Sequence, residues 1–147
     1  MEKKYNKIEE FISKDYSKLM VIWESSVRAT HNFLLEEDFL YYKKKLPIDY
    51  FPNIKLYTIS SNENIFGFLG ASEDNIEMLF ISDLYRGNGH GKRLLDFATN
   101  ELHLKKVDVN EQNFLAVNFY KNFGFKIIKR SLQDNEGKRY PILHMKL

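Results

Sequence analysis

A glycine-rich run flanked by basic residues is the part of the chain best suited to bind an anion. The run is Arg86-Gly87-Asn88-Gly89-His90-Gly91-Lys92, and it lies between a strand-like segment at 76–81 and a helix-like segment at 89–101. In the first turn of a helix, the backbone N–H groups have no intrahelical partner and lie at the positive end of the helix dipole. Alternating glycines let a ligand approach these amides closely. The run therefore predicts a site for a ligand that carries phosphate, with Arg86 and Lys92 adding positive charge.

Hydrophobic periodicity predicts the elements that must position this run. Strands are expected at 8–12, 54–60, 65–71, 76–81, 105–110, 126–132 and 142–145. Helices are expected at 15–29, 36–45, 89–101 and 113–122. This order places one strand–helix–strand crossover in the middle of a meandering chain, which predicts an α+β, mixed α-β domain.

Turn and breaker residues predict where several of these elements end. The segment from Ser61 to Asn64 is typical of a hairpin turn. Pro47 is expected to end the helix at 36–45. Gly124 suits the C-terminal cap of the helix at 113–122.

Two apolar patterns predict which faces are buried. The strand at 76–81 is apolar at odd and even positions apart from Glu77, so we expect it to be buried on both faces. In the helix at 113–122 we expect one apolar stripe to face the core. That stripe consists of Leu115, Phe119 and Phe123.

Composition indicates one globular domain, which we place at residues 1–147. A net charge of only +2 argues against nucleic acid as a partner. The chain has no apolar run of the ~18 residues that a membrane span needs and no signal-peptide pattern, so we expect no membrane association and a cytoplasmic location. It has no cysteine, which excludes disulfides, thiolate metal sites and a cysteine nucleophile. His103 and His144 have no neighbours at metal-ligand spacing, and no Ser/His/Asp order suggests an acyl-enzyme, so we expect neither a metal nor a covalent intermediate.

Two segments together resemble the GNAT N-acetyltransferase superfamily. After its fourth strand this family carries Arg or Gln, two residues, Gly, one residue, and then Gly or Ala; Arg86, Gly89 and Gly91 occupy those positions. A second family segment, an Asn-initiated helix with a Tyr shortly before Gly-Phe, matches the stretch from Asn113 to Phe125, with Tyr120 as that Tyr. The resemblance implies a central mixed, mostly antiparallel twisted sheet of about seven strands, with about four helices on both faces. It also implies a splay between strands 4 and 5.

A dinucleotide-binding fold is an alternative source of a glycine-rich turn. Such folds place the turn after the first strand of a βαβ unit and an acidic residue at the end of the next strand. Here other strands come first, and Asp108 lies within the next strand rather than at its end. No Gly-Lys-Ser/Thr follows the turn, which excludes a Walker-type loop.

The resemblance implies that acetyl-CoA is the cosubstrate. In the family, the glycine-rich turn binds the pyrophosphate through backbone amides, and the preceding strand pairs with the pantetheine arm. A backbone N–H near Phe80 would polarise the thioester carbonyl, a contribution of ~3 kcal/mol to the barrier. The residues that this resemblance assigns to the coenzyme are Leu79, Phe80, Ile81, Arg86, Gly87, Asn88, Gly89, His90, Gly91, Lys92, Asn113, Asn118 and Tyr120.

The same resemblance implies catalytic roles. Tyr120 matches the family's general acid, because a phenol with a pKa near ~10 stays protonated at neutral pH and can donate to the departing thiolate. The attacking amine must lose a proton. Glu77, a lone carboxylate on an apolar strand, is the expected base, and Glu24 and His31 are further candidates. The family builds its acceptor pocket from the early part of the chain, where the expected lining residues are Trp23, Glu24, His31, Phe33 and Tyr57.

The sequence therefore predicts a GNAT-like enzyme that moves an acetyl group from acetyl-CoA to a primary amine by direct attack. A non-catalytic module that senses acyl-CoA or binds a partner on the same fold is the alternative. It would keep the glycine-rich turn but would need neither Tyr120 nor a base. The acceptor is expected to be a small-molecule or peptide amine, and the protein a monomer or a homodimer.

Overall fold

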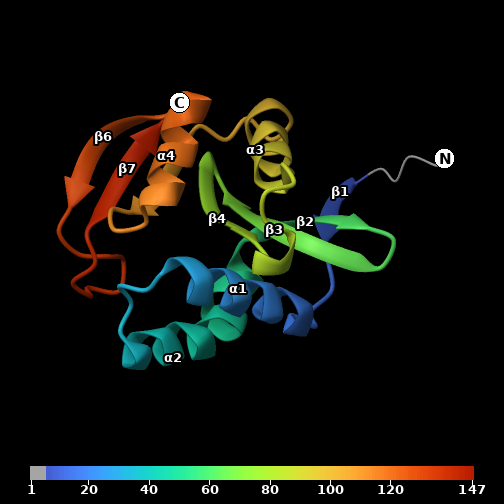
Figure 1. Cartoon of the computed structure of the whole chain (residues 1–147), viewed down its shortest axis with the longest axis horizontal. Coiled ribbons are helices and arrows are strands. Elements are labelled where there is room, and N and C mark those ends of the chain that lie inside the picture. The colour runs from blue at the N-terminus through green and yellow to red at the C-terminus, as the bar shows by residue number, and fades with distance from the viewer. Residues whose placement is uncertain (1–5) are drawn as a thin grey trace.

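The computed structural model describes residues 6–147, which form a seven-stranded sheet with helices on both faces (Figure 1). The strands are β1 (Lys7–Phe11), β2 (Lys55–Ser61), β3 (Asn64–Ser72), β4 (Asn75–Ile81), β5 (Lys106–Asn110), β6 (Lys126–Ser131) and β7 (Ile142–Lys146). The α-helices are α1 (Ser17–Thr30), α2 (Glu36–Lys45), α3 (His90–Asn100) and α4 (Phe114–Phe123). Three short helical turns complete the described elements: η1 (Leu46–Tyr50), η2 (Phe51–Asn53) and η3 (Asp83–Tyr85).

The sheet is antiparallel except at one point. Its order is β1-β2-β3-β4-β5-β7-β6, and only the β4–β5 pair is parallel. These two strands pair at Asn75 with Lys106 and at Ile76 with Val107, and no further along the chain. Beyond Ile76, the edge of β4 that faces β5 therefore has no strand partner. The predicted fold class, including the splay between strands 4 and 5, is confirmed.

Alternating side chains of the central strands divide the interior into two hydrophobic cores. On β3, Leu69 packs with α3 and α4, whereas Phe68 packs with α1 and α2. On β2, Tyr57 and Leu56 divide in the same way. Figure 1 shows α1 and α2 on one side of the sheet and α3 and α4 on the other. None of the helices in the described part of the chain is long and apolar enough to cross a membrane.

The local signals placed most element ends correctly. Ser61 pairs with Asn64 across a two-residue turn, as predicted. Asn113 caps α4, since its side-chain oxygen accepts a hydrogen bond from the Ala116 amide at 3.2 Å. Gly124 follows α4 with a φ of 121°, a backbone conformation that favours glycine.

Three local predictions were wrong in part. The α-helix α2 ends at Lys45, as predicted, but the chain then continues as the π-helical turn η1, in whose first turn Pro47 lies. β4 is not buried on both faces: only Ile76 is fully buried, because the strand runs along the splay. The stripe predicted on α4 is only partly correct: Phe119 and Phe123 pack against the core, but Leu115 is 63% exposed, and the fully buried residues of the helix are Val117 and Tyr120.

Gly67 sets how closely β3 and β4 approach at the end of β4. A Cβ atom at this position would lie 2.4 Å from Cδ1 of Ile81 and 2.5 Å from the carbonyl oxygen of Phe80. We expect Gly67→Ala to lower the free energy of unfolding by about 1–3 kcal/mol, the usual cost of overpacking. Urea unfolding followed by circular dichroism measures this change. Gly91→Ala is the control, because its Cβ would make only ordinary contacts of 3.6 Å or more; equal stability of the two variants would contradict the expectation.

Candidate active site

The glycine-rich run forms an open loop that leads into α3. Gly87 and Gly89 both have φ near 80°, and Gly89 is the N-cap residue of the helix. Within residues 6–147, no hydrogen bond occupies the backbone amides of residues 87–92. Arg86 is held beside the loop by an ion pair with Asp83 at 3.0 Å. The loop thus offers consecutive free donors at the positive end of a helix, which suits an anionic group.

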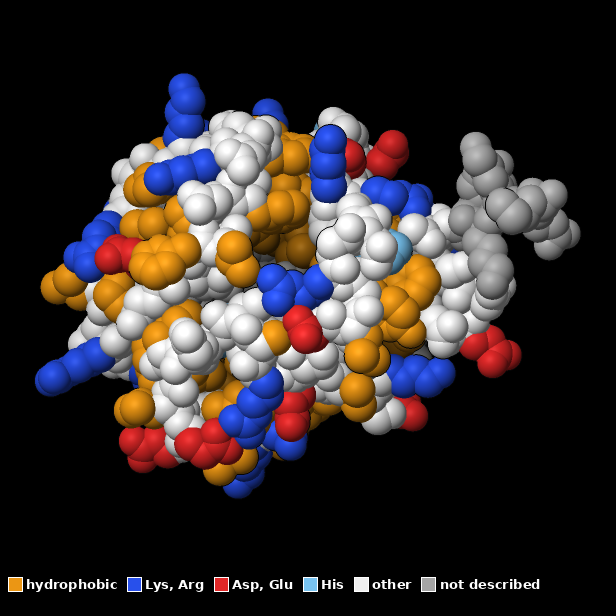
Figure 2. All heavy atoms as spheres, viewed as in Figure 1, with side chains coloured by type: hydrophobic (Ala, Val, Ile, Leu, Met, Phe, Trp, Pro, Cys, Tyr) orange, Lys and Arg blue, Asp and Glu red, His pale blue; other side chains and the backbone are white. Residues whose placement is uncertain are grey.

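A cleft lies beside this loop, between α3 and α4. A Cβ atom on Gly91 would lie 3.6 Å from Cζ of Phe119 and 3.8 Å from Cγ1 of Ile81, so the start of α3 approaches α4 and the end of β4. Figure 2 shows a hollow with hydrophobic side chains between α3 and α4, with Lys and Arg side chains around its rim. Leu79, Phe80 and Ile81 are only partly buried here, on the part of β4 that has left β5.

Tyr120 lies in the core under this cleft. Its side chain is 6% exposed and packs edge-on against Phe119 and Phe125, with ring centroids at 5.2 and 5.5 Å. Burial raises the pKa of Tyr120, so the phenol is protonated at neutral pH. Its hydroxyl has no hydrogen-bond partner within the described chain. Every fully buried side-chain nitrogen or oxygen in the described residues has a partner, so this hydroxyl is not fully buried. The hydroxyl is therefore open to the space beside it and free to donate.

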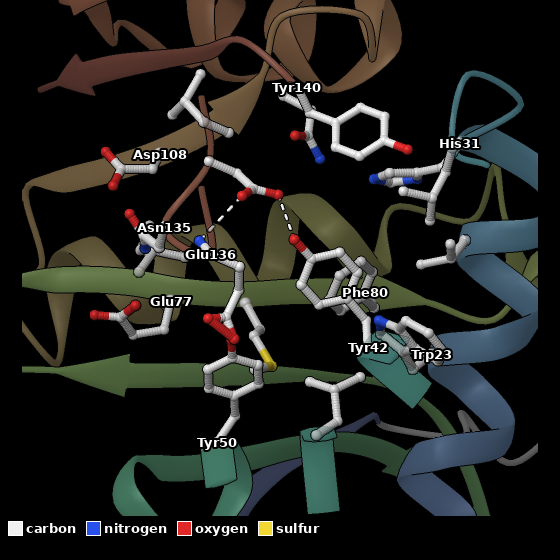
Figure 3. A pocket seen from close by; sticks show the side chains of 18 of the residues that line it. Trp23, His31, Tyr42, Tyr50, Glu77, Phe80, Asp108, Asn135, Glu136 and Tyr140 are labelled. Carbon is white, nitrogen blue, oxygen red and sulfur yellow. Dashed lines mark hydrogen bonds between the residues drawn. The ribbon is translucent and has the colours of Figure 1, made fainter. Parts of the chain in front are cut away.

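A cavity of about 470 Å³ lies on the opposite face of the sheet, between β4, β5, α1 and the segment that connects β6 to β7 (Figure 3). Its lining is aromatic and acidic and includes no Lys or Arg. The lining residues are Trp23, Val27, His31, Leu34, Tyr42, Leu46, Tyr50, Asn75, Ile76, Glu77, Met78, Phe80, Asp108, Asn110, Asp134, Asn135, Glu136, Tyr140 and Ile142. β4 lines both the cleft and this cavity, on opposite faces of the sheet, where it has left β5.

Two of the four lining carboxylates hold the cavity together. Glu136 accepts hydrogen bonds from Tyr50 at 2.6 Å and from Lys45 at 2.5 Å, and the Lys45 ammonium holds the pKa of Glu136 below its ordinary value. Asp134 accepts a hydrogen bond from the Tyr42 hydroxyl and another from the Glu136 amide at 3.0 Å. These bonds attach the β6–β7 connection to α2 and η1.

The other two carboxylates are less engaged. Glu77 and Asp108 each come one residue after the last β4–β5 pair, Ile76 and Val107, and both line the cavity. Within the described residues, the side-chain partner of Glu77 is Ser72, at 2.5 Å. The side-chain partner of Asp108 is His144, at 2.7 Å. Both carboxylates are exposed and have oxygen lone pairs left for a ligand.

The structure groups only some of the predicted pocket residues. Trp23 and His31 line the cavity, and Phe33, which does not, packs against the His31 ring at a tilt of 39° with ring centroids 5.2 Å apart. Glu24 lies outside the lining and pairs with Lys43 at 2.7 Å. Tyr57 does not lie near the cavity: it belongs to the core on the other face of the sheet, because neighbouring residues of a strand point to opposite faces.

Other predicted residues have roles within the protein itself. The His90 side chain turns away from the cleft and stacks on Phe66 at 4.4 Å, although its amide lies in the loop. Asp108, His144 and Ser131 form a hydrogen-bonded chain with two contacts of 2.7 Å, an order that the sequence did not suggest. Ser131 and His144 are not among the cavity-lining residues, so this chain braces three strands. No group of three His, Asp or Glu residues within 6–147 is arranged to hold a metal ion.

Sequence reasoning missed most of the lining, including Asp108 on β5. It also missed every lining residue from α2, η1 and the β6–β7 connection, which are Tyr42, Leu46, Tyr50, Asp134, Asn135, Glu136 and Tyr140. The β6–β7 connection lies about 90 residues after α2 and η1 in the chain, and no periodic pattern links it to them. The only signal in the sequence was the cluster of tyrosines at 41–50, because the hydroxyl of a buried tyrosine usually needs a hydrogen-bond partner.

Comparison with known proteins defines the class. The model of the acetyltransferase (GNAT) domain matches residues 40–147, and the chain belongs to the GNAT family. It is an acetyl-CoA-dependent N-acetyltransferase, as the sequence predicted.

Similar proteins span nearly the whole chain. Peptidyl-lysine N-acetyltransferase YjaB of Salmonella typhimurium is 37% identical over 129 residues, which cover 87% of this chain and 88% of that protein. The Escherichia coli protein of the same name is 37% identical over 131 residues, or 86% of each chain. The solution structure of apo YjaB from Escherichia coli superposes with a TM-score of 0.87 at 34% identity, covering 97% of both chains. The coenzyme A complex of PaiA N-acetyltransferase from Thermoplasma acidophilum has the same fold, with a TM-score of 0.73 at 18% identity over 97% of this chain and 99% of that one.

The glycine-rich loop is tested by blocking access to its amides. We expect Gly89→Val to weaken acetyl-CoA binding at least tenfold, because the added side chain would cover the free donors. Isothermal titration calorimetry measures the dissociation constant. Gly137→Val is a matched control, since Gly137 also has a positive φ with nothing within 4 Å but lies between β6 and β7. Wild-type affinity in a folded Gly89→Val protein would exclude the loop as the anion site.

Proposed function

We propose that this enzyme acetylates the ε-amino group of lysine residues in peptides or proteins. The observation that carries the proposal is the acidic cavity, which adjoins the splay and is lined by four carboxylates without a Lys or Arg. Similarity to the peptidyl-lysine N-acetyltransferases supports the same acceptor.

A lysine side chain suits this cavity in charge and in shape. Glu77 and Asp108 would attract the ammonium group, since each has a single side-chain partner among the described residues, Ser72 and His144, and has oxygen lone pairs left to accept. Trp23, Tyr50 and Phe80 would contact the aliphatic stem, as aromatic walls often do for long cationic side chains. The mouth of the cavity is open, which would allow a lysine to enter while the rest of its chain stays outside.

On the cleft side, the free amides from Arg86 to Lys92 would hold the pyrophosphate of acetyl-CoA. The unpaired edge of β4 from Leu79 to Ile81 would bind the pantetheine arm by hydrogen bonds of the kind that add a strand to a sheet. Asn113, the N-cap residue of α4, and Asn118, an exposed residue of the same helix, would contact the coenzyme. The thioester would then lie at the splay, between the cleft and the cavity.

The reaction would be a direct attack. Glu77 would receive the proton of the lysine ammonium through water in the cavity, and the neutral amine would attack the thioester carbonyl. Tyr120 would donate its proton to the sulfur as the C–S bond breaks. The described chain would form one domain of a cytoplasmic monomer or homodimer.

An acceptor panel tests the proposed substrate. We expect a short peptide with a blocked N-terminus and one internal lysine to gain 42 Da on its lysine in the presence of acetyl-CoA, as read by mass spectrometry. The comparisons are the same peptide with arginine in place of lysine, a lysine-free peptide with a free N-terminus, spermidine and an aminoglycoside. Turnover of one of the last three without the lysine peptide would refute the proposed acceptor.

The proposed general acid is tested with Tyr120→Phe. Loss of the hydroxyl should lower kcat by ~10²-fold, the scale of a general acid, and leave the dissociation constant of acetyl-CoA unchanged. Tyr57→Phe is the matched control. Both tyrosines are buried in the same core, but Tyr57 lies on β2, which is separated from β4 by β3 and does not border the splay. A wild-type kcat in Tyr120→Phe would remove this residue from the mechanism.

A further inference from the structure

The hydrogen bonds around His31, a residue of the cavity lining, determine which tautomer its imidazole adopts. His31 follows α1 as the C-cap residue, where its amide donates to the carbonyl oxygen of Val27 at 2.8 Å. Figure 3 shows its imidazole pointing into the cavity next to Tyr140, across from Glu77. The imidazole ring also packs against the ring of Phe33, with centroids 5.2 Å apart.

The neighbouring Thr30 fixes which ring nitrogen carries the proton. The Thr30 hydroxyl lies 2.7 Å from the carbonyl oxygen of Ser26 and 2.8 Å from Nδ1 of His31. A carbonyl can only accept, so the single hydroxyl proton of Thr30 points to Ser26. The Thr30 oxygen must then accept from His31, which places the imidazole proton on Nδ1 and leaves Nε2 with a free lone pair.

The lone pair on Nε2 is available to a ligand. None of the described residues donates a hydrogen bond to Nε2. Every fully buried side-chain nitrogen or oxygen in the described residues has a hydrogen-bond partner, so Nε2 is not fully buried and is open to the cavity that His31 lines. Tyr140 does not compete for it, because its hydroxyl donates to Asp38 and accepts from the Leu35 amide at 3.1 Å. Burial lowers the pKa of His31 to about 4, so the ring stays neutral at physiological pH.

We propose that Nε2 of His31 binds the attacking nitrogen directly and takes a proton from it during acetyl transfer. This inference rests on the proposed use of the cavity for the acceptor amine. A lysine ammonium sheds two protons in becoming an amide nitrogen, and the first goes to Glu77 through water. As the N–C bond forms, the second passes to Nε2 while the C–S bond breaks and Tyr120 protonates the sulfur. The proton on His31 then returns to the Tyr120 phenolate through solvent, so that one proton is released overall.

Four variants separate this role from a structural one. His31→Asn keeps an amide near the position of Nδ1, opposite Thr30, but has no atom at the position of Nε2. We expect it to lower kcat by ~10²-fold, the scale of a general base, with acetyl-CoA binding unchanged. His31→Gln places an acceptor oxygen near the position of Nε2 and should retain more activity than His31→Asn. His103→Asn is the control, because His103 is exposed on a left-handed backbone that Asn tolerates well.

Thr30→Val tests the hydrogen bond between Thr30 and Nδ1 of His31 without changing a residue of the cavity lining. The imidazole stays in place but loses the hydrogen bond that selects its tautomer, so kcat should fall roughly two- to tenfold, as expected for one hydrogen bond. Equal kcat values for His31→Asn, Thr30→Val and wild type on a turned-over amine would overturn the inference and leave the proposed function standing.

Nitrogen-15 NMR of the free enzyme gives a test that needs no acceptor. We expect the Nε2 shift of His31 to be that of an unprotonated nitrogen at pH 7 and to change only as the pH falls towards 4. A protonated Nε2 at pH 7 would overturn the inference whatever amine the enzyme acetylates. If the lysine peptide is not a substrate, the proposed acceptor fails, and the His31 variants are compared on the amine that is turned over.

Discussion

β4 and β5 share two residue pairs and then diverge, and the rest of the site depends on that divergence. If β4 and β5 were paired along their full length, the backbone N–H and C=O groups of Leu79, Phe80 and Ile81 that face β5 would be used in hydrogen bonds within the sheet. Because the strands part, this edge of β4 is available from the side of α3 and α4 and also from the side of α1. The glycine-rich loop lies where β4 leads into α3, so an anion bound by its amides would be next to the open edge.

The cavity on the other face depends on contacts between distant segments. Hydrogen bonds from Tyr42 and Tyr50 to Asp134 and Glu136 attach the β6–β7 connection to α2 and η1. Exposed ion pairs contribute little to stability, but these carboxylates are half-buried and receive several donors each. Of the four carboxylates, Glu136 is paired with Lys45 and Asp108 with His144, whereas the donors to Asp134 and Glu77 are neutral, so the cavity keeps a net negative charge.

The parts of this site that were predictable from sequence are those determined by neighbouring residues. The glycine-rich loop, the Asn113 cap and the order of strands follow from local chemistry and periodicity, and they appear where expected. The buried face of α4 was predicted wrongly because its first turn is apolar on more than one side, and only the packed core determines that Leu115 stays outside. The Tyr–carboxylate contacts could not be predicted, because they join residues about 90 positions apart without a shared motif.

The two groups that we propose for proton transfer would have opposite requirements, and the sheet separates them. Tyr120 must hold its proton, and burial in the core under the cleft raises its pKa. His31 must lack a proton on the nitrogen that faces the acceptor, and burial together with Thr30 produces that state on the opposite face. A cavity lined only by carboxylates would bind an ammonium well but would favour its charged, unreactive form. A neutral acceptor such as Nε2 carries no negative charge, so it raises the pKa of the amine less than a carboxylate would and favours the charged form less.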